Sequence, residues 1–262
     1  MRPYASVLYG SYRGLRSRNV TVYLQPEAKR VIWLFRALLC ALWMDEERFA
    51  RPFRTFRVRI PRYVARFDSS LKGLGLLIGV IKGDPLHPVW VGGGAASLLV
   101  LEFGENSAYQ NLSEFIGVVI VCYVLSKLGL AMEAVELQGD SETALTWSVE
   151  QRYRGKLVTN AAVVYTLLGA KTGVRLECSR HLEAAKNTEC DGLSRGLSLE
   201  GVELSGVPDL RLQDDPIVCA LIELCRPPAV YDANDPPVPQ TEAEFLAFWQ
   251  GVRSVIAIIA TV

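Results

Sequence analysis

The 262-residue chain has only two histidines, no pair of cysteines at CxxC spacing and no long apolar run. Its longest apolar run, residues 115–125, is eleven residues long and ends at Ser126-Lys127. A membrane-spanning helix needs about 20 apolar residues, so the sequence predicts no membrane span. The six scattered cysteines and the lack of a signal peptide at the front favour reduced thiols and an intracellular protein.

Glycine and proline are also too scarce for a collagen-like or low-complexity protein, at 21 and 13 residues. Half of the residues are apolar and 21% are charged, which is the composition of a globular chain. A chain of this length can bury a full hydrophobic core, and it suits one domain with appendages or two small domains. Disordered and fibrous classes are therefore excluded.

The formal net charge is zero, but the charges are separated along the chain. Residues 1–66 hold 14 Lys and Arg against 4 Asp and Glu, a net charge of +10. Residues 197–262 hold 3 against 10, a net charge of −7. A basic stretch interleaved with aromatic residues suits a polyanion such as nucleic acid, with a solvated arm that binds nothing as the alternative.

The apolar periodicity divides the chain into three parts. Residues 1–59 form a basic arm with one predicted helix, which begins at Pro26 and ends near Trp43. Residues 60–196 predict three strands, a helix, a strand, helices, a strand and a short helix, which is a mixed α/β arrangement. Residues 197–262 form an acidic, Pro-punctuated tail that ends in an amphipathic helix, so a domain edge is predicted near residues 196–200.

Capping residues predict the ends of two of these helices. Asn111 or Ser113 is expected to cap the long buried helix, and Gly129 to close it. Residues 156–169 predict another helix, closed by Gly169.

Acidic residues lie at the ends of four predicted elements. They are Asp68 at the end of a strand, Glu114 at the start of the long helix, Asp140 at the end of a strand, and Asp191 in the last short helix. Mg²⁺ prefers carboxylate oxygens, and two such ions about 4 Å apart can activate a water and stabilise the leaving oxygen of a phosphodiester. Spacing alone does not separate such a site from solvated or helix-capping carboxylates.

The sequence around each acid is more specific than the spacing. The first three stretches read FDSSLKGLG at 67–75, NLSEF at 111–115 and GDSETAL at 139–145. The fourth, at 181–195, reads HLEAAKNTECDGLSR. Together and in this order, these motifs resemble the ribonuclease H-like domain of retroelement reverse transcriptases, of the type 1 ribonuclease H family.

This resemblance covers about residues 60–196 and implies a five-stranded mixed sheet flanked by helices. It implies hydrolysis of the RNA strand of an RNA–DNA hybrid by an endonuclease that holds two Mg²⁺ ions, with Mn²⁺ as a substitute. The implied catalytic and metal-binding residues are Asp68, Glu114, Asp140 and Asp191. By the same resemblance, Ser69, Asn187 and Arg195 are expected to contact the substrate. His181 is expected to be structural, fixing its strand to a neighbouring loop.

The chain departs from the family pattern in several places. Glu183-Ala184 stands where Pro-Gly is usual, Cys190 replaces an alanine, and the loop before Asp191 lacks the histidine of the cellular enzymes. The Tyr-x-Asp-Asp motif of a polymerase is absent from these residues, so a polymerase domain is separate or lost.

Two other classes of function stay open at this stage. One is a domesticated, inactive module that binds nucleic acid or nothing. The other is a different metal-dependent nuclease or an integrase-like member of the same superfold, which the Asn-x-x-x-Asp-x-Leu-Ser-Arg ending disfavours. The residues indicate no oligomeric state.

Overall fold

The computed structural model describes residues 59–101, 107–151, 157–174, 176–226 and 242–259, together with Ile32 and Tyr153. The basic arm of residues 1–59 and its predicted helix lie outside these described residues, apart from Ile32, which is helical, and Arg59.

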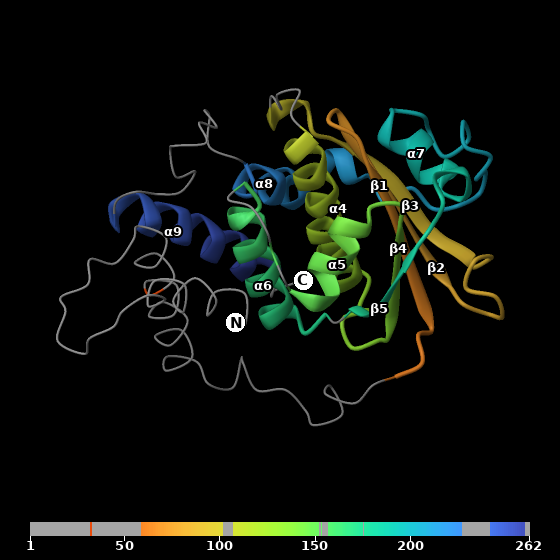
Figure 1. Cartoon of the computed structure of the whole chain (residues 1–262), viewed down its shortest axis with the longest axis horizontal. Coiled ribbons are helices and arrows are strands. Elements are labelled where there is room, and N and C mark those ends of the chain that lie inside the picture. The colour runs from red at the N-terminus through yellow and green to blue at the C-terminus, as the bar shows by residue number, and fades with distance from the viewer. Residues whose placement is uncertain are drawn as a thin grey trace, which may run out of the picture.

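One mixed sheet of five strands organises the molecule, in the order β3-β2-β1-β4-β5 (Figure 1). Its strands are β1 (Tyr63–Ser69), β2 (Gly73–Val80), β3 (Val89–Ser97), β4 (Val135–Gly139) and β5 (Leu176–His181). β2 pairs antiparallel with both β1 and β3, whereas β4 runs parallel to β1 and to β5. The predicted fold class, a five-stranded mixed sheet flanked by helices, is confirmed.

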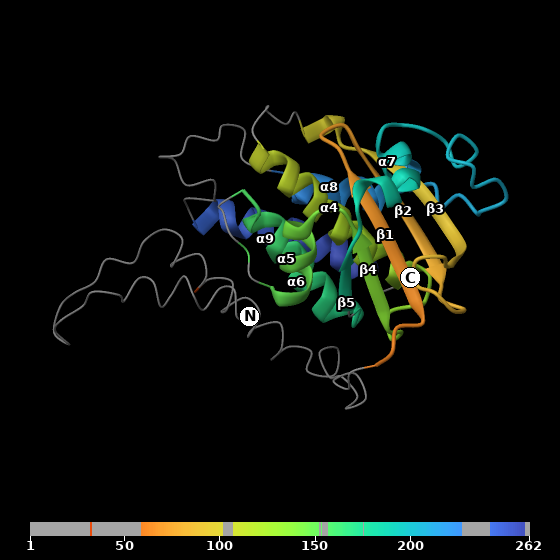
Figure 2. The same cartoon turned by 45° about the vertical axis from the view of Figure 1, so that its right-hand side comes forward.

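The helices are divided unequally between the two faces of this sheet. They are α4 (Ser107–Lys127), α5 (Glu142–Glu150), α6 (Thr159–Thr172), α7 (Thr188–Ser194), α8 (Pro216–Leu224) and α9 (Glu242–Ile259). Figures 1 and 2 show α4, α5 and α6 on one side of the sheet and the short α7 on the other. α8 and α9 pack behind α4 and α6, away from the sheet.

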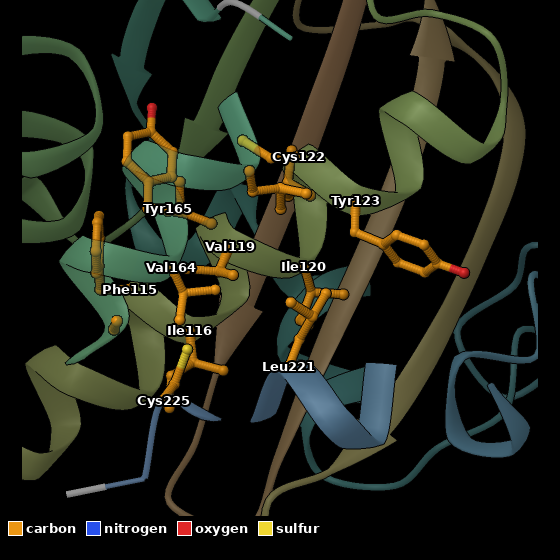
Figure 3. Close-up of a cluster of buried hydrophobic side chains, with 14 of the residues drawn as sticks. Phe115, Ile116, Val119, Ile120, Cys122, Tyr123, Val164, Tyr165, Leu221 and Cys225 are labelled. Atoms are coloured by element: carbon orange, nitrogen blue, oxygen red, sulfur yellow. The ribbon is translucent and has the colours of Figure 1, made fainter. Parts of the chain in front are cut away.

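The main hydrophobic core lies between the sheet and the long helix α4 (Figure 3). Phe115 of α4 is completely buried, and its ring contacts those of Trp147, Tyr153 and Tyr165 at centroid distances of 5.4–5.7 Å. Leu221 of α8 joins the same cluster. Burial of this continuous apolar surface is the dominant force that holds the helices on the sheet.

α4 is also long and apolar enough to match a membrane span by length and composition, over Tyr109–Lys127. Within the protein, however, 72% of that window is buried. Such burial is what the core helix of a folded domain requires, so the length of α4 gives little reason to expect a span.

The ends of α4 and α6 differ from the predicted ends at three of four points. α4 begins at Ser107, so Asn111 and Ser113 lie inside it, and the Ser113 hydroxyl donates a hydrogen bond to the Gln110 carbonyl. Gly129 closes α4 as predicted, at φ +71°. α6 begins at Thr159, three residues after the predicted start, and runs through Gly169 to the positive φ of Gly173. Gly169 is tolerated inside the helix because an interior glycine costs only about 1 kcal/mol.

Residues 197–226 pack against the sheet and its helices. Leu199, Val202 and Leu204 pack against a small apolar cluster beside α7, and α8 contributes to the main core. Asp215 caps α8 by accepting hydrogen bonds from the Ile217 and Val218 amides, with Pro216 in the first turn. The domain boundary near residues 196–200 stays a prediction, and the described residues just after it pack against both hydrophobic clusters. The predicted terminal helix is present as α9.

Candidate active site

Asp68 lies near the end of β1, on the face of the sheet that α7 covers. Side chains alternate between the two faces of a strand, so its neighbours Phe67 and Ser69 point towards α4. Directly opposite Asp68 in the antiparallel register is Gly75 of β2. Asp68 is 7% exposed, which leaves its carboxylate nearly enclosed by α7 and the neighbouring strand ends.

Two glycines of β2 allow α7 to lie directly on the sheet beside Asp68. A Cβ atom on Gly75 would lie 2.4 Å from the Cys190 carbonyl oxygen and 2.6 Å from the Leu193 Cβ. A Cβ atom on Gly73 would lie 2.7 Å from the Ser194 carbonyl oxygen. Only glycine permits so close an approach of two backbones, which explains in physical terms the spaced glycines of the first motif.

Hydrogen bonds fix α7 at both of its ends. Asn187, completely buried, donates its amide to the Phe67 carbonyl of β1 at 3.1 Å. At the other end, Ser194 donates its hydroxyl to the Asp68 carboxylate at 2.6 Å, and Ser70 donates to the Ser194 carbonyl. These bonds hold the helix that carries Asp191 against the strand that carries Asp68.

Asp140 follows β4 immediately and is brought to the same place by parallel pairing of β4 with β1. The register pairs Arg66 with Gln138, so the ends of the two strands lie side by side. His181 at the end of β5 donates its Nε2 proton to the Asp140 carbonyl oxygen at 3.0 Å. The bond joins the end of β5 to the residue after β4, which is what fixing a strand to a neighbouring loop would need.

The electrostatics of Asp68 show that the acids are neighbours. The pKa of Asp68 is raised to about 7, first by burial and then by the charges of Asp140 and Asp191, against the lowering effect of the Ser194 hydroxyl. Burial, followed by the charge of Asp140, also raises the pKa of Glu114, while hydrogen bonds from Ser141 and Gln110 lower it. Asp68 thus interacts with Asp140 and Asp191, and Glu114 interacts with Asp140.

Glu114 reaches this site from the second turn of α4. Gln110, four residues earlier on the same helix face, donates its amide to the Glu114 carboxylate at 2.9 Å. The same amide donates to the Ser69 carbonyl at the end of β1. Gln110 thus ties Glu114 to the strand that carries Asp68.

Asp191 is paired with a cation of its own helix. Arg195 donates two hydrogen bonds, at 2.7 and 2.9 Å, to one oxygen of the Asp191 carboxylate. The Arg195 side chain is 70% exposed, so this is a surface ion pair, of the kind that stabilises a protein by at most about 1 kcal/mol.

The acids are close together, but they do not form a ready-made set of metal ligands. In the part of the chain that the structure describes, no three His, Cys, Asp or Glu side chains are arranged to hold a metal ion. Asp68 instead accepts a hydrogen bond from Ser194, and Asp191 pairs with Arg195. The donor set nevertheless fits a hard divalent cation, because it offers only carboxylate oxygens whose mutual repulsion such an ion would relieve.

Two of the three residues expected to contact a substrate are buried. Ser69 is 2% exposed and faces α4, where Gly117 lies against it. Asn187 is 0% exposed because its side chain anchors α7 to β1. Contact of these two side chains with a substrate stays a prediction that their burial does not favour, whereas the Arg195 side chain is exposed.

Three residues at the site were not predicted from the sequence, namely Ser194, Gln110 and Arg66. Ser194 lies in the last motif, and Gln110 lies four residues before an acid on a helix, so both carried a local signal. Arg66 contacts residues 72 positions away, and no local pattern predicts such a contact.

No protein-family model and no curated protein matches this chain. Among solved structures, the RNase H1 from the halophilic archaeon Halobacterium salinarum NRC-1 is similar. The two chains are 17% identical, the match covers 50% of this chain and 93% of that one, and the TM-score is 0.36. A likeness at this level carries no conclusion about activity, so the candidate function depends on the site itself.

Proposed function

We propose that this chain is a metal-dependent endonuclease that hydrolyses the RNA strand of RNA–DNA hybrids and is related to retroelement ribonuclease H domains. The observation that carries the proposal is the convergence of four acids from separate parts of the chain. Parallel pairing of β1 with β4 brings Asp68 and Asp140 to one edge, and hydrogen bonds of Ser194 and Gln110 tie the helices of Asp191 and Glu114 to β1. Acidic residues with a strongly shifted pKa, such as Asp68, are concentrated at functional sites, because catalytic groups need pKa values matched to their task. The order of the four sequence motifs and the residues in them support the same reaction.

In this proposal Asp68 and Asp140 would hold the divalent cations, with Glu114 and Asp191 completing the set. A bound cation would lower the pKa of an attacking water and neutralise the charge that develops on the phosphate. Ser194 keeps the Asp68 carboxylate oriented, and Gln110 does the same for Glu114. Each carboxylate is thus held before a substrate arrives, which reduces the reorganisation needed during reaction.

Substrate selection would come from the shape of the hybrid and from the nucleic-acid backbone. Proteins distinguish RNA from DNA through the 2′-hydroxyl and the wide minor groove of A-like helices. Arg195 at the rim of the site carries an exposed guanidinium, a group suited to phosphate. The net charge of +10 on residues 1–66 would add sequence-independent affinity that weakens with salt.

A second candidate is an inactive module that binds nucleic acid. The pairing of Asp191 with Arg195 favours it, because the pair occupies a carboxylate that a cation would need. The departure at Glu183-Ala184 from the family pattern points the same way.

A cleavage assay separates the two candidates. The full chain is mixed with a hybrid labelled on both strands, with Mg²⁺ or with a chelator. The nuclease should cut the RNA strand only when Mg²⁺ is present. Asp140→Asn should reduce the rate by about 10³-fold or more, since it removes one negative charge from the cation site while keeping its shape.

Asp214→Asn is the matched control, because Asp214 is exposed and lies in the turn before α8. It should cut at the wild-type rate. A wild-type chain that binds the hybrid but never cuts it with Mg²⁺ or Mn²⁺ would favour the binding module.

A further inference from the structure

Arg66 is a buried arginine on the strand that carries Asp68, two residues before it and on the same face of the sheet. It is only 4% exposed. Arginine is almost never so buried unless its guanidinium is fully engaged. The contacts of this guanidinium therefore indicate what the residue does.

The guanidinium joins β1 to β4 through a hydrogen-bonded fork. Its Nε and one terminal nitrogen donate to the Gln138 side-chain oxygen at 3.1 and 3.0 Å. Gln138 lies on β4, two residues before Asp140. Gln138 is itself fixed, because its amide nitrogen donates to the Glu136 carboxylate at 2.9 Å and to the Pro85 carbonyl at 3.0 Å.

The same guanidinium reaches α7 and the loop between β2 and β3. One terminal nitrogen lies 3.7 Å from the Glu189 carboxylate, and Glu189 is two residues before Asp191. The other donates to the Leu86 carbonyl at 3.1 Å. The Trp90 ring lies against the guanidinium, with its centroid 4.9 Å from the Arg66 Cζ atom.

Arg66 thus contacts both of the other elements that bring an acid to this face of the sheet. Those contacts fall on residues two positions before the acids of β4 and α7, and Arg66 itself is two positions before the acid of β1. α7 has only seven residues. Besides the hydrogen bonds at its ends, it is held by a small apolar cluster whose buried members are Leu77, Cys190 and Leu193, with partly buried side chains against them. A buried polar network can fix a geometry that so small an apolar contact does not.

We propose that Arg66 is a positioning residue, which sets the placement of Asp140 and Asp191 relative to Asp68 through Gln138 and Glu189. It touches no reacting group. Because it would act on the carboxylates that hold the cations, this inference rests on the proposed function. Residues that orient metal ligands typically change metal affinity or activity by about 10–100-fold when they are substituted.

The test compares Arg66→Met with Arg180→Met. Arg180 pairs with Glu136 at the far end of the same network, at 2.6 Å, so its loss weakens the network without cutting the links from Arg66. The first readout is the backbone amide spectrum of the metal-free protein. Arg66→Met should move the resonances of residues 140 and 189–195, and Arg180→Met should leave them in place.

The second readout is steady-state cleavage of the hybrid. Arg66→Met should lower kcat by about 10–100-fold and leave KM within about twofold, because the hybrid does not touch Arg66. Arg66→Lys should show the same loss, since a lysine keeps the charge but lacks the fork that binds Gln138. Equal kcat values for wild type and Arg66→Met, or equal movement of the amides in Arg180→Met, would overturn the proposal.

Glu189→Ala is a second variant, which tests the proposal even if Arg66→Met does not fold. The Glu189 side chain is 30% exposed, and its removal cuts only the link to α7. It should move the amides of residues 190–195 and leave that of residue 140 unchanged, and no movement at 190–195 would contradict the positioning role. If the wild type does not cut the hybrid, the proposed function fails, while the amide spectra still decide the role of Arg66.

Discussion

The two faces of the sheet in this protein are built from different chemistry. Along β1 the side chains of Ala65 and Phe67 enter the apolar core under α4, while those of Arg66 and Asp68, which alternate with them, face α7. On β4, Leu137 enters the same core, whereas Glu136 and Gln138 belong to the buried polar network of the α7 face. In both strands, apolar side chains on the α4 face therefore alternate with polar side chains on the α7 face.

The α4 face therefore stabilises the fold, and the α7 face carries the acids of the candidate site. The α4 face buries a continuous apolar cluster, which supplies most of the free energy of folding. The α7 face holds carboxylates that repel one another, and Asp68 keeps a raised pKa there. A site of clustered acids lowers the stability of the fold, so the fold can hold one only when the opposite face is well packed.

Loss of apolar volume on the α4 face should have the largest effect on folding. Phe115→Ala removes a completely buried ring that contacts three other aromatic rings. The free energy of unfolding should fall by about 3–5 kcal/mol, measured by urea denaturation. Cleavage per folded molecule should not change, and a loss below about 1 kcal/mol would contradict the assignment of stability to this face.

A methyl group between β2 and α7 should damage the site more than the fold. Gly75→Ala places a Cβ against the Cys190 carbonyl and the Leu193 side chain, so α7 must move away from Asp68. We expect the free energy of unfolding to fall by about 1–3 kcal/mol, and the cleavage rate to fall at least tenfold.

Gly83→Ala is the matched control for this substitution, since no atom lies within 4 Å of a Cβ at Gly83. It should change neither quantity. If Gly75→Ala cuts the hybrid as fast as Gly83→Ala does, close contact between α7 and β2 is not needed for activity.

The raised pKa of Asp68 predicts a smaller effect that depends on pH. Its folded pKa of about 7 exceeds the value of about 3.9 in an unfolded chain. The protonated carboxyl therefore favours the fold below about pH 4, and this contribution is lost as the pH rises to 7 and above. Asp68→Asn should therefore stabilise the metal-free protein by at most about 4 kcal/mol at pH 8 and by nothing at pH 4.

Thermal denaturation at the two pH values checks this prediction. Asp214→Asn serves as the control, because Asp214 is exposed. It should show the same small change at both pH values. A gain for Asp68→Asn that is equal at pH 4 and pH 8 would mean that the charge of Asp68 costs the fold nothing.

Much of the fold could be predicted because its signals are local. The alternation along β1, the turn that follows it and the apolar run of α4 each specify one element. The end of α4 at Gly129 was predictable because a glycine at positive φ is the usual close of a helix. The start of α4 was not, because Asn111 and Ser113 resemble caps although both lie inside the helix.

The candidate site was predictable to the level of its acids and no further. The motifs mark Asp68 and Asp140, but they do not say which polar neighbours are buried. Ser69 and Asn187 were assigned to the substrate for that reason, and the structure places both inside the fold. Arg66 and Gln138 are 72 positions apart in the sequence, so only the pairing of β1 with β4 brings them into contact.

Direct cation binding tests the central claim that the acids of the α7 face form a divalent-cation site. Calorimetric titration of the full chain with Mn²⁺ at pH 8 should give saturable binding. Asp140→Asn should bind at least tenfold more weakly, because a hard cation depends on the negative charge of its ligands, and Asp214→Asn should bind as the wild type does. Saturable binding of equal strength in Asp140→Asn and wild type, or none in the wild type, would contradict the account.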